Sequence, residues 1–211
     1  MSATKHLCNI LTILAAGLLL IACENPTGSG SGNVGDGDIT YEVGSRGPAG
    51  GLIFYVDDGN FYDDFDYLEA APADWSGGAD PELEWQIAAE DVTNTDQARG
   101  SGPDNTEEII TQSTSGTPAA TAADTLEING YADWFLPSLK ELEEMKVRLD
   151  EQGLGGFEDA LYWTSSSQGT TGVPGSPHYV LVEDFDPDSD AATRSATTFQ
   201  RVRPVRAGSI E

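Results

Sequence analysis

The chain has 211 residues, with 36 Asp and Glu against only ten Lys and Arg, and its formal net charge is −26 at pH 7. A surface this acidic disfavours nucleic acid and anionic lipid headgroups as partners, because both are negatively charged. Both cysteines, Cys8 and Cys23, lie near the N terminus, so the rest of the chain has no disulfide and depends on its hydrophobic core.

The first 22 residues have the pattern of a secretory signal. One cation, Lys5, precedes an apolar run over residues 7–22 that is too short for a membrane-spanning helix. The run ends in Leu20-Ile21-Ala22-Cys23, which resembles the lipobox of bacterial lipoproteins. This resemblance implies that residues 1–22 are cleaved off and that Cys23 is acylated at the new N terminus; an ordinary cleaved signal peptide is the alternative. The mature chain then carries nine cations against 36 carboxylates, a net charge of −27.

Residues 23–40 are expected to form the lipidated cysteine and a flexible linker. Seventeen of them, from Glu24 onward, are mainly Gly, Ser, Asn and Asp, a composition that buries too little apolar surface to fold. Such a coil has a root-mean-square span of about 20–25 Å. Two or more acyl chains would anchor it durably to a membrane of the cell envelope. Because Glu24 replaces the aspartate that marks inner-membrane retention in enteric bacteria, the outer membrane is favoured.

Residues 41–207 are long enough for one domain with a sizeable core, followed by a short tail at 208–211. The apolar run Leu52–Val56, between two glycines and an Asp-Asp-Gly turn, predicts a buried strand. Residues Tyr67–Ala71 predict a second strand, and Trp85–Ala89 a weaker third.

Three helices are predicted in the middle of the chain. A short one begins at Asn105 or Thr106, and a second runs from Thr117-Pro118 to about Ile128, before Asn129-Gly130. The clearest runs from Leu139 to about Gln152, because Ser138 and Glu141 form a capping box ahead of an apolar stripe.

The C-terminal part returns to strands. They are predicted at Leu161–Thr164, His178–Phe185 and about Thr197–Val205, where Pro204 requires an edge, an end or a bulge. The last two are joined by the Asp-rich turn over residues 186–190. Helices grouped between early and late strands indicate an α+β fold.

Three sequence blocks carry a family resemblance by their order and spacing. They are Gly50–Tyr55; Asn129–Ser138 followed by Glu141-Leu142; and Tyr162–Ser166 followed by Val202–Arg206. Together they resemble the DUF1566 domain, also called the Lcl C-terminal domain. The resemblance implies a single C-type-lectin-like domain, related to the formylglycine-generating and sulfatase-modifying fold. In that fold the terminal strands pair and two main helices flank small antiparallel sheets.

The resemblance also implies roles for some residues. Trp134 and Trp163 are expected in the core or bracing loops, and Asn129–Trp134 is expected at a helix-to-strand corner. The best-known function in the family is adhesion and glycan binding at the cell surface. The sequence lacks the Glu-Pro-Asn, Gln-Pro-Asp and Trp-Asn-Asp motifs with which C-type lectins bind sugars through calcium.

The alternating aspartates of the C-terminal turn are a candidate Ca²⁺ site, formed by Asp184, Asp186, Asp188 and Asp190. It is not an EF-hand, because Ser189 and Ser195 stand at the sixth and twelfth positions of that loop. The alternative is a solvated acidic turn. A second acidic cluster could hold a metal or could be a loop packed onto the domain; it consists of Asp57, Asp58, Asp63, Asp64 and Asp66.

Aromatic residues are the candidate glycan-binding groups. We expect Trp75, Trp85 and Tyr131 to be exposed and to stack on sugars, although burial is the commoner fate of tryptophan. The cations near the C terminus would pair with carboxylates in the fold or form an anion-binding site; they are Arg194, Arg201, Arg203 and Arg206.

A catalytic function has little support in the sequence. Beyond the signal, His178 is the only histidine, and no serine has the flanks of a nucleophile elbow. The leading interpretation is a non-catalytic, membrane-anchored binding module for a glycan or another envelope ligand, with Ca²⁺ as the only candidate cofactor. The alternatives are a structural envelope lipoprotein that binds another protein, with an oligomer allowed but not specified, and a hydrolase.

Overall fold

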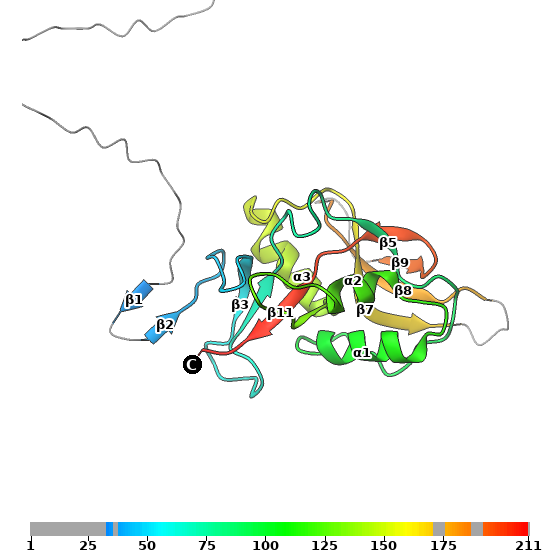
Figure 1. Ribbon diagram of the computed structural model, residues 1–211, viewed down its shortest axis with the longest axis horizontal. Helices are drawn as coiled ribbons and strands as arrows, with labels where there is room; N and C mark the ends of the chain where they lie inside the picture. The colour runs from blue at the N-terminus through cyan, green and yellow to red at the C-terminus, as the bar shows by residue number, and fades with distance from the viewer. Residues whose placement is uncertain (1–32, 36–37, 171–175, 187–191, 211) are drawn as a thin grey trace, which may run out of the picture.

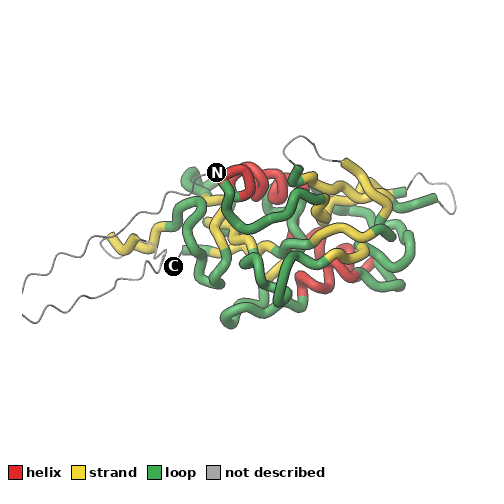
Figure 2. Tube along the Cα trace, turned by 90° about the horizontal axis from the view of Figure 1, so that it is seen from above, coloured by secondary structure: helices red, strands yellow, loops and turns green. Residues whose placement is uncertain are grey.

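The computed structural model describes residues 33–35, 38–170, 176–186 and 192–210 (Figure 1). The signal segment, Cys23, Asp188 and Asp190 lie outside these residues. The described part is an α+β domain with small, mainly antiparallel sheets, as the sequence predicted. Strand β3 lies toward one end of the domain, and β8 and β9 lie toward the other (Figure 1). Figure 2 shows from above that helices flank the strands.

The helices and strands follow in chain order: β1 Asn33–Gly35, β2 Asp38–Thr40, β3 Leu52–Val56, β4 Tyr67–Ala70, β5 Glu82–Glu84, α1 Gly102–Gln112, α2 Pro118–Asp124, β6 Trp134–Phe135, α3 Leu139–Arg148, the 3₁₀ helix Asp150–Gln152, β7 Leu161–Gly169, β8 Tyr179–Asp184, β9 Ala192–Ser195, β10 Phe199–Arg201 and β11 Val205–Gly208.

Two sheets build the domain. One has the strand order β3-β4-β11-β6 and is fully antiparallel. The other has the order β5-β10-β7-β8-β9, in which β10 and β7 are parallel. The resemblance implied that the terminal strands pair, but the first and last strands of the domain, β3 and β11, lie on opposite sides of β4.

Several predicted boundaries are wrong. Helix α1 begins at Gly102 instead of Asn105 or Thr106, because Pro103 is favoured in the first turn. The expected strand over 197–205 is two strands in different sheets, because Pro204 has no N–H for a ladder and its carbonyl instead accepts from Ala71 N at 2.9 Å. The expected strand at 85–89 is replaced by the earlier β5; Trp85 is buried, whereas residues 87–89 are exposed. Helix α2 ends at Asp124, because the chain then turns into a hairpin.

Two predicted features near the ends also differ from the structure. Gly208, expected in the tail, belongs to β11. The segment expected to be a linker contains the two short strands β1 and β2, in which Val34 pairs with Ile39. These two are β-branched residues, which favour extended backbone.

The predicted cap of α3 is confirmed. Ser138 Oγ accepts from Glu141 N at 3.4 Å, and Glu141 Oε2 accepts from Ser138 N at 2.7 Å. Glu141 is fully buried and its other oxygen accepts from Gly100 N at 2.8 Å. The capping box therefore also attaches the chain ahead of α1 to α3.

The buried side chains form two large clusters. One surrounds Trp85 and Trp163, and the other includes Phe54, Tyr162 and Phe185. Trp163 has the core position that the family resemblance implied. Each cluster combines residues from early, middle and late parts of the sequence, so the strands acquire their places only when the whole chain is folded.

The C-terminal arginines form ion pairs within the domain. Arg203 binds Asp80, Arg206 binds Glu69 and Asp133, and Arg201 contacts Glu158 and Glu82. Their guanidinium groups face protein carboxylates, so the expected pairing is confirmed for these three and the alternative of an anion-binding site is not. Arg194 is placed differently, because its guanidinium donates to the carbonyl of Thr193 at 2.8 Å.

Glu90 binds the turn that follows α1. Its carboxylate accepts from Ser113 Oγ at 2.6 Å, Thr114 N at 2.8 Å and Ser115 N at 3.0 Å. Hydrogen bonds from the side chains of Ser113 and Thr114, and then from Ser115 N, lower the pKa of Glu90 from 4.5 to about 2. The ionised carboxylate is thus the form that the fold stabilises.

We expect Glu90→Gln to lower the melting temperature at pH 7, because the amide cannot accept as many of these bonds. A depressed pKa contributes stability above pH 4.5 that is lost as the pH falls toward 2. The difference in melting temperature between the unmodified chain and Glu90→Gln should therefore become smaller as the pH falls from 4.5 toward 2. The exposed Glu151→Gln is the matched control. A gap that is constant from pH 7 to pH 2 would contradict this assignment.

Candidate functional site

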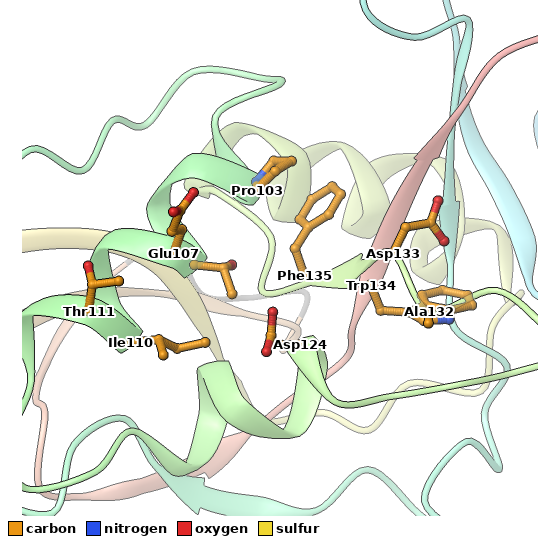
Figure 3. Close-up of a pocket in the computed structure, with 10 residues that line it drawn as sticks. Pro103, Glu107, Ile110, Thr111, Asp124, Ala132, Asp133, Trp134 and Phe135 are labelled. Carbon is orange, nitrogen blue, oxygen red and sulfur yellow. The ribbon is translucent and has the colours of Figure 1, made fainter.

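A groove opens between α1, the end of α2 and β6 (Figure 3). Its volume is about 470 Å³, within the range of small-ligand sites. The residues that line it are Pro103, Thr106, Glu107, Ile110, Thr111, Asp124, Ala132, Asp133, Trp134 and Phe135. We call this set the groove.

The walls of the groove are fixed to each other. Glu107 and Thr111 lie one turn apart on α1, and Asp124 is the last residue of α2 (Figure 3). The hydroxyl of Thr106 accepts from Leu136 N at 3.0 Å, which joins α1 to the residue after β6. Local helix geometry and one cross-link between elements therefore set the width of the groove.

The floor is apolar and rigid. Trp134 is 2 % exposed and Phe135 4 % exposed, and Ile110 on α1 is half-buried. Trp134 Nε1 donates to the carbonyl of Tyr131 at 3.1 Å, so the indole is held in one orientation. The buried Trp134 and Phe135 support the base of the groove, and Ile110 leaves part of its apolar surface accessible to a ligand.

The rim carries negative charge that the protein does not neutralise. Glu107 and Asp124 are exposed, and within the described residues their carboxylates make no hydrogen bond or ion pair. Asp133 differs, because it accepts from Arg206 Nε at 2.9 Å and from its Nη2 at 2.8 Å. The groove therefore offers two free carboxylates as acceptors for hydroxyl or ammonium groups.

A tight hairpin at residues 128–131 comes directly before the groove residues Ala132 and Asp133. Ile128 and Tyr131 exchange two backbone hydrogen bonds of 3.0 Å across Asn129 and Gly130, whose φ angles are 52° and 85°. Positive φ at both central positions is the type I′ turn that Asn-Gly favours. Asn129 also donates to the carbonyl of Ala49 at 2.9 Å. This hairpin lies at the helix-to-strand corner that the resemblance implied.

A second hollow includes Tyr131 of this hairpin in its lining. Its volume is about 390 Å³, and its lining consists of Tyr41, Pro48, Tyr67, Tyr131, Arg206, Ser209 and Ile210. We call it the tyrosine hollow. The guanidinium of Arg206 lies 4.2 Å from the centre of the Tyr131 ring. Arg206 also bonds Glu69 Oε2 at 3.3 Å, and burial raises the pKa of Glu69.

The structure separates the three aromatic residues predicted to bind sugars. Trp85 is 0 % exposed and donates from Nε1 to the carbonyl of Thr164 at 2.9 Å, so its expected exposure is wrong. Its ring fills the core cluster that also contains Trp163. Trp75 is half-buried and bonds Asp80 at 2.8 Å. Of these three residues, Tyr131 is the one that contributes to the tyrosine hollow.

The predicted calcium site is only partly described. The carboxylate of Asp184 accepts from Asp186 N at 3.1 Å, and the carbonyl of Asp184 accepts from Lys146. Within the described residues no group of three or more His, Cys, Asp or Glu side chains is arranged to hold a metal. Because Asp188 and Asp190 lie outside those residues, calcium binding there stays a prediction.

The second acidic cluster belongs to a loop that is packed onto the domain. Asp57 accepts from Tyr62 N at 2.8 Å, and Asp66 accepts from Ile210 N at 2.6 Å. Tyr62 and Phe65 stack with their ring centres 4.7 Å apart, and Phe65 is buried. At least two of the aspartates therefore stabilise the loop and its contact with the C terminus.

His178 contacts a serine. Its Nε2 lies 2.7 Å from Ser167 Oγ, and its Nδ1 bonds the carbonyl of Glu90. Because a carbonyl only accepts, Nδ1 carries the proton and the Ser167 hydroxyl donates to Nε2. Burial lowers the pKa of His178 and favours the neutral ring. The third partner is a carbonyl where a Ser/His/Asp triad has a carboxylate, and Ser167 Oγ also accepts from Gly169 N at 2.8 Å. The contact between His178 and Ser167 therefore connects β7 to the loop that contains Glu90.

The two free carboxylates of the groove were not identified from the sequence. Glu107 and Asp124 belong to different helices and have no distinctive spacing among 36 acidic residues. Tyr131 and Asp133 did carry a signal, because they belong to the block Asn129–Ser138. Tyr131 lines the tyrosine hollow and Asp133 lines the groove, a placement that the sequence did not indicate.

Comparison with known proteins gives no family for the chain: no protein-family model matches the sequence, and a search of curated proteins finds no match. Within the described residues no helix is long and apolar enough to span a membrane.

Proposed function

We propose that the protein is a lipid-anchored, non-catalytic binding module of the bacterial cell envelope, resembling the DUF1566 domain, and that it binds a glycan. The single observation that carries the binding proposal is the groove, with its apolar floor and two free carboxylates. Tethering through Cys23, with the outer membrane favoured, is supported by the lipobox-like tetrapeptide.

The chemistry of the groove suits a sugar. Carboxylates accept hydrogen bonds from hydroxyl groups, and the half-buried side chain of Ile110 can contact the C–H surface of a pyranose ring. The same carboxylates, on a chain of net charge −27, disfavour sulfated or otherwise anionic glycans. The expected ligand is neutral or carries amines.

The direct test is a glycan array probed with the full chain in detergent, with and without Ca²⁺. We expect neutral or amine-bearing glycans to bind, and the double variant Glu107→Gln/Asp124→Asn to weaken binding at least about tenfold. Loss of a hydrogen bond that involves a charged group costs about 1.5–3 kcal/mol. A requirement for Ca²⁺ would support the acidic turn as a second component.

The matched control is Asp63→Asn/Glu151→Gln, which removes the same charge at exposed positions away from the groove. We expect it to bind as the unmodified chain does. Equal losses in the two double variants would show a general charge effect and contradict a site in the groove. Preferred binding of sulfated glycans would contradict the proposed ligand class.

A structural lipoprotein that binds another protein is the second candidate. It is favoured by Phe61, whose residue surface is 78 % exposed in the loop over residues 57–66. This candidate would be favoured over glycan binding if no glycan on the array bound with or without Ca²⁺. It also requires that cross-linking through this loop recovers a stable protein partner.

A further inference from the structure

The groove and the tyrosine hollow meet at one short segment of chain. Tyr131 lines the tyrosine hollow, and the next three residues, Ala132, Asp133 and Trp134, line the groove. Asp133 also bonds Arg206, which lines the tyrosine hollow. The two hollows are therefore neighbours on the surface, separated by the Asp133–Arg206 pair.

The separating segment is open to solvent. Ala132 and Asp133 are exposed, and the side chain of Asp133 keeps 52 % of its surface accessible while it binds Arg206. A ligand that leaves the groove can cross this segment without displacing a buried side chain. Asp133 has a carboxylate within reach of such a ligand.

The tyrosine hollow offers aromatic faces and little net charge. The rings of Tyr41 and Tyr67 lie 4.6 Å apart at an angle of 54°. The positive charge of Arg206 is balanced by Glu69 and Asp133. Tyrosine presents an apolar ring with a polar hydroxyl, which matches the mixed surface of a sugar.

We propose that the groove and the tyrosine hollow are two subsites of one binding track, and that the ligand is a linear neutral or amine-bearing oligosaccharide that fills both across Asp133. The inference rests on the proposed glycan function and adds to it a requirement for chain length. Linking two weak contacts in one ligand raises the overall affinity, because the second contact forms at a high effective concentration.

The test is a calorimetric length series with the full chain in detergent. The probes are chitin oligomers, which are neutral, and chitosan oligomers, which carry amines, from the disaccharide to the octasaccharide. We expect the affinity to rise at least about tenfold with length and then to level off when both subsites are filled.

Two variants assign the subsites. Tyr41→Ala alters the tyrosine hollow and Glu107→Gln alters the groove, and a thermal melt verifies that each variant is folded. We expect each to lower the affinity for the octasaccharide toward that of the disaccharide on the unmodified chain. The exposed Glu151→Gln, which lines neither hollow, should keep the full length dependence.

The outcomes separate the two proposals. Binding that does not depend on length, or that Tyr41→Ala leaves unchanged at every length, overturns the two-subsite track and leaves the glycan function standing. No binding of either series, together with a silent array, overturns both.

Discussion

Replacing Arg203 by methionine should destabilise the domain by about 3–5 kcal/mol, because it leaves the carboxylate of Asp80 buried without its counter-ion. Both side chains are 1 % exposed, and two hydrogen bonds of 2.7 Å join them. For a domain of this length, that loss lowers the melting temperature by roughly 6–20 °C.

A second substitution shows whether the charge or the packing is responsible. Asp80→Asn in the Arg203→Met background removes the unpaired charge, and we expect it to recover part of the stability. Arg148→Met is the control for the first substitution, because Arg148 is exposed, and its effect should stay within about 0.5 kcal/mol. Equal melting temperatures for Arg203→Met and Arg148→Met would contradict a structural role for the buried pair.

Trp85→Ala should have an effect of similar size, about 3–5 kcal/mol, because it opens a cavity in the main core cluster. Trp85→Phe keeps most of the ring volume but loses the bond from Nε1 to the carbonyl of Thr164, so it should be intermediate. Thermal melts measure both, with Phe199→Ala as the control at an aromatic residue that is 59 % exposed.

The same variants distinguish a core tryptophan from a ligand-binding one. We expect the folded fraction of Trp85→Phe to bind glycan as the unmodified chain does. Weaker glycan binding by Trp85→Phe at unchanged stability would restore the sequence-based assignment of Trp85 to the site.

The features that were predicted well depend on neighbours in the sequence. The start of α3 followed from Ser138 and Glu141, three residues apart, and the strand Leu52–Val56 followed from its apolar run between turn residues. The end of α2 was misjudged although its cause was also local. The type I′ turn at Asn129-Gly130 needs Ile128 as a hairpin partner, which takes that residue out of the helix.

The features that were missed depend on residues far apart in the chain. Residues 197–205 were predicted to form one strand, yet Pro204 separates β10 and β11, which join different sheets. The buried indole of Trp85 donates a hydrogen bond to the carbonyl of Thr164, which lies 79 positions later in the chain. No pattern within a short window of sequence contains that information.

The amino-acid sequence alone was enough for the α+β class, the acidic surface, the absence of disulfides after Cys23 and the N-terminal cap of α3, because these follow from composition and from contacts within a few residues. It also supplied the lipobox-like segment, which lies outside the described residues. The groove, the tyrosine hollow and the pairing of the late arginines required the folded chain. Glu107 lies on α1, Asp124 on α2 and Asp133 just before β6, and only the packing of these elements brings the three carboxylates around one cavity.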